Sequence, residues 1–158
     1  MLRLSELLDA GAVVLDLQAQ DVPDLLHRVV EPLVTAGRLD AEAAEGLAKA
    51  LLERELQGCT GVGLGVALPH AYVDQVPTPM MLIARLATPI AYGQCPDGKP
   101  VDLVFLLTGP DSAKRTHVKV LAKLVRLLHD GAWVEALRAA TSPDTVREAM
   151  QAVEARHA

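Results

Sequence analysis

Segments with strand character alternate with amphipathic helical segments along this chain, and the alternation constrains the fold more than any other feature. Short apolar runs rich in β-branched and aliphatic residues predict strands at residues 12–17, 79–86 and 101–107. Helical segments are predicted at residues 2–8, 21–34, 41–57, 113–129 and 132–140, and after Ser142. We therefore expect an α/β fold in which a mixed β-sheet has helices packed on both faces.

Capping residues and prolines predict where the helices begin and end. Asp21, Asp40 and Ser142 each precede a helical segment and are typical N-cap residues. Gly58 is expected to end the helix that Asp40 begins, because glycine is common at helix C-termini. Pro32 lies inside the first long segment, where a proline is expected to kink or shorten the helix.

Length and composition favour one globular domain that spans residues 1–158. A chain of 158 residues, of which 51% are hydrophobic, can bury a core without disulfides. It has no run of about 18 apolar residues, which a membrane-spanning helix would need, and its first residues do not resemble a signal peptide. We expect a cytoplasmic protein without direct membrane insertion. Its two cysteines, Cys59 and Cys95, are expected to be reduced thiols.

Several common function classes lack the residues that they require. The formal net charge of −5 argues against a nucleic-acid partner, because nucleic-acid-binding domains are usually basic. A dinucleotide-binding GxGxxG motif would need glycine where Val66 stands, and no phosphate-binding Gly-Lys-Ser/Thr ending occurs. Neither an HExxH motif nor a cysteine pair at ligand spacing is present, so no metal site is expected. The GxSxG motif of serine hydrolases is also missing.

The most informative segment for function is residues 60–70, which read TGVGLGVALPH. Its glycines permit close approach of the backbone or a positive φ around a site, although a simple tight turn would explain them too. We expect a short buried strand that ends at His70, with Pro69 restricting how the imidazole is presented.

Two further polar residues are predicted to point inward near His70. A neutral imidazole is nucleophilic near pH 7, which suits a phosphoryl carrier, although a lone histidine can equally be a surface or core residue. Arg54 lies on the apolar face of its helix, where it meets an anion or simply complements the helix dipole. His117 faces inward at the start of a helix and could be an ordinary core histidine. Together the three residues indicate phosphate chemistry on histidine. The remaining histidines are assigned structural or solvent roles: His27, His129 and His157.

The order of several motifs along the chain matches that of a known family: Arg54-Glu55, TGVG at 60–63, VALPH at 66–70, Asp97-Gly98, the apolar run at 101–107, and HVKVLA at 117–122. In these motifs, the chain resembles the enzyme IIA domains of the phosphoenolpyruvate-dependent sugar phosphotransferase system, of the mannitol, fructose and nitrogen-regulatory type. The likeness covers essentially the whole chain. Leu64, where a polar residue is common in the family, is a modest departure.

The resemblance implies a phosphotransferase that uses neither a metal nor a nucleotide cofactor. In this reading, Nε2 of His70 accepts a phosphoryl group from the histidine phosphocarrier protein, forming a tele-phosphohistidine. The group then passes to a IIB domain for sugar uptake. Arg54 is expected to neutralise the phosphoryl oxygens, and His117 to donate a hydrogen bond to them. Backbone N–H groups at Thr60 and Gly61 are expected to complete a phosphate cradle.

A second reading comes from the nitrogen-regulatory branch of the same family. There the chain would be a regulatory binding module, whose phosphorylation state controls a target protein and which has no transport role. A single domain with no IIB domain after Ala158 favours this reading slightly, although separate IIA subunits also serve transport. The sequence names neither the sugar nor the downstream partner.

Overall fold

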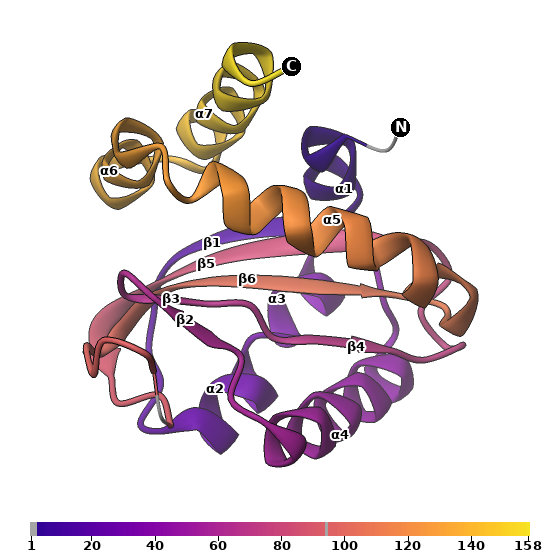
Figure 1. Ribbon diagram of the computed structural model, residues 1–158. Helices are drawn as coiled ribbons and strands as arrows, with labels where there is room; N and C mark the ends of the chain where they lie inside the picture. The colour runs from indigo at the N-terminus through magenta and orange to yellow at the C-terminus, as the bar shows by residue number, and fades with distance from the viewer. Residues whose placement is uncertain (1–2, 94) are drawn as a thin grey trace.

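The computed structural model describes residues 3–93 and 95–158, which form one mixed β-sheet between two layers of helices (Figure 1). The helices are α1 (Leu4–Ala10), α2 (Val22–Arg28), α3 (Glu31–Thr35), α4 (Ala41–Gln57), the 3-10 helix η1 (Asp111–Ala113), α5 (Lys114–Leu127), α6 (Gly131–Ala139) and α7 (Pro143–Arg156). The strands are β1 (Ala12–Leu17), β2 (Gly61–Gly63), β3 (Val66–Ala67), β4 (His70–Tyr72), β5 (Met80–Ile90) and β6 (Val101–Gly109). The predicted α/β fold is confirmed.

The order of strands leaves β4 at an edge of the sheet. The order is β1-β5-β6-β3-β2, and β4 also pairs with β6. β5 and β6 are antiparallel, whereas β1 runs parallel to β5, and β3 and β4 run parallel to β6. Because Val66 pairs with Leu103 and His70 pairs with Leu107, β3 and β4 follow one another along the same side of β6. Among the described strands, β2 pairs with β3 alone.

Helices cover both faces of the sheet, as the alternation of segments predicted. Figure 1 shows α2, α3 and α4 on one face, and α1, α5, α6 and α7 on the other. Side chains of β6 alternate between the two layers: Val104 and Leu106 belong to the first core, and Leu103, Phe105 and Leu107 to the second. A strand that is buried on both faces reads as a continuous apolar run, which is why β6 was recognisable in the sequence.

Capping residues set the start of several helices. The side chain of Asp40 accepts a hydrogen bond of 2.8 Å from the N–H of Ala43, and Ser142 accepts one of 3.2 Å from Thr145. The long helix expected around Pro32 is two helices, because α2 ends at Arg28 and α3 begins three residues later. Pro32 occupies the first turn of α3. The N–H groups of a first turn have no intrahelical acceptor, so the missing N–H of proline costs the helix no hydrogen bond there.

The glycine-rich segment differs from its prediction. Residues 60–70 were expected to form one short strand ending at His70, but they form β2, a turn, β3 and the start of β4. Leu64 and Gly65 make the turn with φ values of 61° and 75°. The positive φ favours glycine at residue 65, and a Cβ atom there would lie 2.6 Å from Nη2 of Arg138, whose side chain would have to shift. The tight-turn explanation is therefore correct for this part of the segment.

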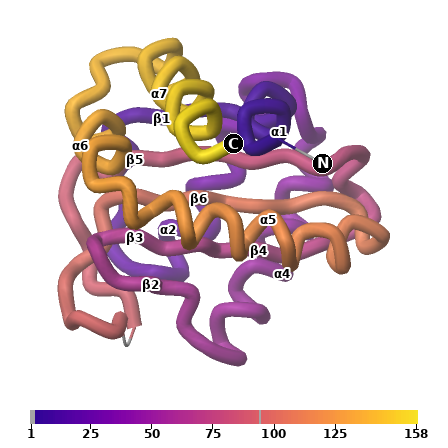
Figure 2. Tube along the Cα trace, turned by 45° about the horizontal axis from the view of Figure 1, so that its top comes forward, coloured from indigo at the N-terminus to yellow at the C-terminus, as the bar shows by residue number. Residues whose placement is uncertain are grey.

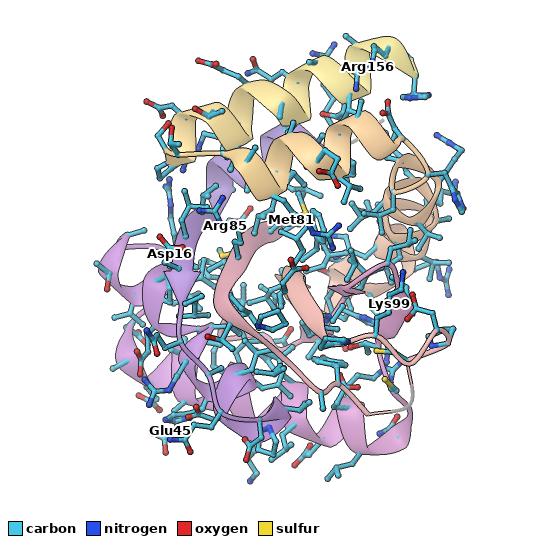
Figure 3. The ribbon with its side chains drawn as sticks, turned by 90° about the vertical axis from the view of Figure 1, so that its left-hand side faces the viewer. Asp16, Glu45, Met81, Arg85, Lys99 and Arg156 are labelled. Carbon is cyan, nitrogen blue, oxygen red and sulfur yellow. The ribbon has the colours of Figure 1, made fainter. Side chains whose placement is uncertain are left out.

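A partly buried arginine on β5 holds the end of α6. Nη1 of Arg85 donates hydrogen bonds to the carbonyl oxygens of Leu137, Arg138 and Ala140 at 3.3, 3.1 and 2.6 Å. These are carbonyls that a helix C-terminus leaves without intrahelical partners. Nη2 of Arg85 also lies 3.6 Å from the carboxylate of Asp16, and Figure 3 shows the two residues below α6 and α7.

The first and last helices lie side by side, as Figure 2 shows. The carboxylate of Glu154 in α7 accepts hydrogen bonds of 2.8 Å from the backbone N–H groups of Leu4 and Ser5 at the start of α1. Glu154 also pairs with Lys123 at 2.7 Å. None of the helices in the described part of the chain combines the length and the apolar character that crossing a membrane requires.

Candidate active site

His70 is the first residue of β4, just after an interruption of the sheet at Leu68 and Pro69. The ladder to β6 continues through this interruption, since the carbonyl of Pro69 accepts a hydrogen bond of 3.0 Å from the N–H of Leu107. Pro69 has no N–H to offer on its other side, and a proline is tolerated there because β4 is an edge strand. The fold thus places a partly buried histidine at the edge of the sheet.

The imidazole of His70 is held in one orientation by the backbone. Its Nδ1 lies 2.8 Å from the carbonyl oxygen of Leu68, which can only accept a hydrogen bond. Nδ1 therefore carries the proton, and Nε2 keeps its lone pair. Burial lowers the pKa of His70, and the nearby charge of Arg54 lowers it further, while the bond to Leu68 acts in the opposite direction. His70 is accordingly a neutral imidazole with a nucleophilic Nε2 at pH 7.

His117 is fully buried and packs against Tyr72. Nδ1 of His117 lies 2.9 Å from the hydroxyl of Tyr72, and the two rings meet edge to face with centroids 5.0 Å apart. Nε2 of His117 has no hydrogen-bond partner among the described residues, although it is buried. Burial lowers the pKa of His117, and the neighbouring His70 lowers it further. The structure therefore brings the two predicted histidines close to each other. Nδ1 of each is hydrogen-bonded, and Nε2 of each has no hydrogen bond among the described residues.

An open cavity of about 410 Å³ lies beside His70, between α4 and α5. Arg54 and Glu53 line it from α4, and Lys114 lines it from the first turn of α5. Nη1 of Arg54 donates a hydrogen bond of 3.0 Å to the carbonyl of Gly58, its only hydrogen bond within the described part of the chain. Two cationic side chains next to a nucleophilic nitrogen suit an anionic group such as a phosphoryl group.

Thr60 and Gly61 are not placed as a phosphate cradle would require. The N–H of Thr60 donates to Glu55 at 2.7 Å, and its hydroxyl donates to the same carboxylate at 2.6 Å. The hydroxyl of Tyr92 donates to Glu55 as well, at 2.8 Å. The N–H of Gly61 faces Sγ of Cys59 at 3.3 Å, and neither Thr60 nor Gly61 lines the cavity. Their N–H groups are engaged in holding the loop after α4, which corrects this part of the prediction.

Tyr72 and Lys114 are among the cavity residues that were not predicted from the sequence. Tyr72 is two residues beyond His70 on the same strand, so strand alternation places both side chains on one face. Lys114 is three residues before His117 and therefore one helical turn away. Both positions follow from periodicity once the strand and helix boundaries are known.

The other histidines lie away from this cavity. His27 and His129 are exposed, and His157 is exposed with Nε2 at 2.9 Å from Asp130. Within residues 3–93 and 95–158, no three His, Cys, Asp or Glu side chains are grouped in a way that could hold a metal ion.

Comparison with known proteins identifies the family. Residues 6–153 match the family described as Phosphoenolpyruvate-dependent sugar phosphotransferase system, EIIA 2. A nitrogen regulatory protein of Bradyrhizobium diazoefficiens is 40% identical over 111 residues, which is 70% of this chain and 72% of that protein. The fructose-specific EIIA component of the phosphotransferase system of Haloferax volcanii is 38% identical over 120 residues, or 76% of either chain.

A solved structure shares the architecture as well. The crystal structure of the nitrogen regulatory protein IIA-Ntr from Neisseria meningitidis aligns with a TM-score of 0.79 and 30% sequence identity, covering 92% of this chain and 97% of that chain. The resemblance read from the motifs is confirmed by a match over nearly the whole sequence. The chain belongs to the EIIA 2 family of the phosphoenolpyruvate-dependent sugar phosphotransferase system and is a phosphotransferase of that system.

Proposed function

We propose that Nε2 of His70 accepts a phosphoryl group from a phosphohistidine of the histidine phosphocarrier protein and passes it on. The observation that carries this proposal is the hydrogen bond of 2.8 Å between Nδ1 of His70 and the carbonyl of Leu68. This bond leaves the lone pair on Nε2, so no base is needed to remove a proton before attack. The lowered pKa keeps that lone pair available at neutral pH.

The transfer exchanges one phosphorus–nitrogen bond for another. Nε2 of His70 forms a bond to phosphorus while the bond to the donor imidazole breaks, and the donor leaves as a neutral imidazole. The phosphorylated ring of His70 still carries its Nδ1 proton and thus gains positive charge, which the carbonyl of Leu68 stabilises. Arg54 and Lys114 offset the negative charge that is spread over the phosphoryl oxygens in the transition state.

His117 supplies a hydrogen bond to the phosphoryl group through Nε2. The hydroxyl of Tyr72 can donate to Nδ1 of His117, and this arrangement places the imidazole proton on Nε2. An unpartnered buried N–H is costly unless a ligand accepts from it, and a phosphoryl oxygen on His70 is such an acceptor. Tyr72 therefore acts as a positioning residue that selects the tautomer of His117.

The proposed donor and acceptor proteins dock over the same histidine. Val118, in α5 beside the cavity, exposes 66% of its surface, which provides apolar area around the charged centre. A small, partly apolar rim is suited to brief encounters with both the phosphocarrier protein and a IIB domain. Every described strand joins the single sheet, and we propose that residues 1–158 act as one domain in the cytoplasm.

The acceptor site can be tested by phosphorylation in vitro. The protein is incubated with phosphoenolpyruvate, enzyme I and the histidine phosphocarrier protein, and the acid-labile phosphate is mapped by mass spectrometry at alkaline pH. We expect label on His70 alone and none on the His70→Ala variant. His129→Ala is the matched control, because His129 is exposed and distant from the cavity. Label that persists on another histidine of the His70→Ala variant would overturn the proposal.

Control of a regulatory partner is the second candidate function. It is supported by the likeness to nitrogen regulatory proteins, whereas the likeness to a fructose-specific component supports transfer to a IIB domain for sugar uptake. Phosphorylation adds nearly two negative charges at the proposed docking face, enough to change affinity for a charged partner. Affinity capture from the native lysate, with phosphorylated wild type and His70→Ala as baits, separates the two. A partner retained by one bait alone supports regulation, and recovery of only IIB or permease components with both baits supports transport.

A further inference from the structure

Two cysteines from distant parts of the sequence meet at one backbone carbonyl. Cys59 lies in the loop between α4 and β2, and Cys95 lies in the connection between β5 and β6. Sγ of Cys59 donates a hydrogen bond of 3.4 Å to the carbonyl oxygen of Tyr92, and Sγ of Cys95 donates one of 3.0 Å to the same oxygen. A shared acceptor at these distances places the two thiols next to each other.

Two glycines provide the space that the sulfur atoms occupy. A Cβ atom added at Gly61 would collide with Sγ of Cys95 and lie 3.3 Å from Sγ of Cys59. One added at Gly93 would lie 3.1 Å from Sγ of Cys59. Both sulfur atoms thus border the position that a side chain at residue 61 would fill. Because Gly61 does not line the cavity at His70, we assign its lack of a side chain to this thiol pair.

The two thiols differ in their access to solvent. Cys59 is exposed, whereas Cys95 is partly buried. Burial raises the pKa of the Cys95 thiol, and the adjacent Cys59 raises it further. Reaction with a small oxidant therefore begins at Cys59, and the protonated Cys95 beside it is placed to react second.

We propose that Cys59 and Cys95 form a reactive dithiol site that hydroperoxides convert reversibly to an intramolecular disulfide. The thiolate of Cys59 attacks a peroxide oxygen and becomes a sulfenic acid, while the other peroxide oxygen leaves as water or an alcohol. The sulfur of Cys95 then attacks the sulfenic sulfur, a second water leaves, and the disulfide forms. The two thiols lose two electrons in total, and the peroxide gains them. A thiol reductant restores the pair by exchange.

This site is separate from the proposed phosphoryl acceptor. Neither cysteine lines the cavity at His70, and the dithiol chemistry requires no phosphate. The disulfide would join the loop after α4 to the connection before β6. Both of its sulfur atoms lie within hydrogen-bond distance of the carbonyl oxygen of Tyr92. The proposal can therefore fail or succeed independently of the phosphoryl transfer.

The test uses the full chain, reduced and freed of reductant, with hydrogen peroxide as the probe. Remaining thiols are blocked at intervals and the digested protein is analysed by mass spectrometry without reduction. In the wild type, we expect Cys59 and Cys95 to disappear together, with one cross-linked peptide about 2 Da lighter than the two thiol peptides combined. Dithiothreitol should restore both thiols.

Single variants decide whether the two thiols act as a pair. In Cys95→Ser, we expect Cys59 to accumulate sulfenic and sulfinic acid, because the resolving thiol is gone. In Cys59→Ser, Cys95 should stay reduced over the same exposure. The proposal is wrong if Cys59 of the wild type accumulates sulfenic and sulfinic acid as it does in Cys95→Ser. It is also wrong if Cys59 forms disulfides only between molecules while Cys95 stays free.

Discussion

Two arginines in helices on opposite faces of the sheet show how differently the same side chain is used. Arg138 in α6 donates to both carboxylate oxygens of Asp102, with Nη2 and Nε at 2.9 and 3.0 Å, and Nη2 also donates to the carbonyl of Leu64. Arg54 in α4 makes one hydrogen bond in the described part of the chain, to the carbonyl of Gly58. Both side chains border a cavity, but Arg138 engages Nε and Nη2 whereas Arg54 engages Nη1 alone among the described residues, so Arg54 keeps more of its donors free.

The difference separates a structural region from a reactive one. Around α6, Arg85 and Arg138 donate to helix and turn carbonyls, so several of their donors are engaged within the fold. Around β4, Nε2 of His70 and most donors of the Arg54 guanidinium stay free beside one cavity, and Nε2 of His117, packed behind Tyr72, has no partner among the described residues. A buried polar group without a partner is costly, and such groups persist where a ligand can satisfy them. The four predictions below test this distinction.

Replacing Arg54 with alanine should have the largest effect. We expect phosphoryl transfer to His70 to slow by roughly 10²–10³-fold, as for the loss of one preorganised donor to a transition-state oxygen. Arg54→Lys should be impaired too, because a point charge does not reproduce the planar fork. Single-turnover transfer from the phosphorylated phosphocarrier protein measures this, with thermal unfolding as the check on folding. Transfer rates close to wild type in both variants would show that Arg54 is structural.

Replacing Arg138 with alanine should produce the opposite pattern. The variant leaves the partly buried Asp102 without its bidentate partner, and we expect a loss of about 1–3 kcal/mol in the free energy of unfolding. Phosphoryl transfer by the folded protein should be unchanged, because Arg138 does not line the cavity beside His70. Urea unfolding and single-turnover transfer should be measured on the same preparation. A variant that transfers slowly while unfolding like wild type would remove the contrast between the two arginines.

The Tyr72→Phe substitution should slow transfer by about tenfold, the equivalent of one hydrogen bond. Without the hydroxyl, nothing on the Tyr72 side fixes the His117 proton on Nε2. Tyr92→Phe is the matched control, since its hydroxyl bonds to Glu55 and Thr60 rather than to a histidine. Equal effects of the two substitutions on the rate would show that the hydroxyl of Tyr72 has no special role.

The smallest effect concerns pH. Both His70 and His117 have a pKa below the ordinary 6.5, so the unfolded chain binds protons more readily than the folded one as the pH falls below that value. The contribution of the two neutral histidines to the free energy of unfolding is complete above pH 6.5. It is lost as the pH falls through the lowered pKa values of the folded protein. We expect the free energy of unfolding to decrease between pH 7.5 and 5.5, and less so in His117→Gln. An identical decrease in that variant would mean that His117 does not contribute.

Much of this arrangement was accessible from sequence, because it depends on local signals. Asp40 and Ser142 cap helices as expected, and the apolar run of β6 was recognisable because both of its faces are buried. Arg54 and His117 were placed inward by helical periodicity, and the structure brings both toward His70. These features need no knowledge of which strands are neighbours.

The errors arose where long-range contacts decide the structure. The family resemblance led to the expectation that backbone N–H groups at Thr60 and Gly61 bind phosphate. Their actual partners are Glu55 and Cys59, and the space at Gly61 is required by Cys95, 34 positions later in the sequence. No local pattern indicates that the β5–β6 connection reaches this loop. Similarly, the break between β3 and β4 depends on pairing with β6.

The bond from His70 to Leu68 has a consequence for how the protein can change over evolutionary time. Its acceptor is a main-chain oxygen, which every amino acid possesses, so no substitution at residue 68 can delete it. The protonation of His117, by contrast, depends on a hydroxyl that one exchange of Tyr72 removes. Mutation can therefore adjust the contact between Tyr72 and His117, while the nitrogen available on His70 stays the same. The rate of the proposed transfer can therefore drift, whereas the nitrogen proposed to bond to phosphorus cannot.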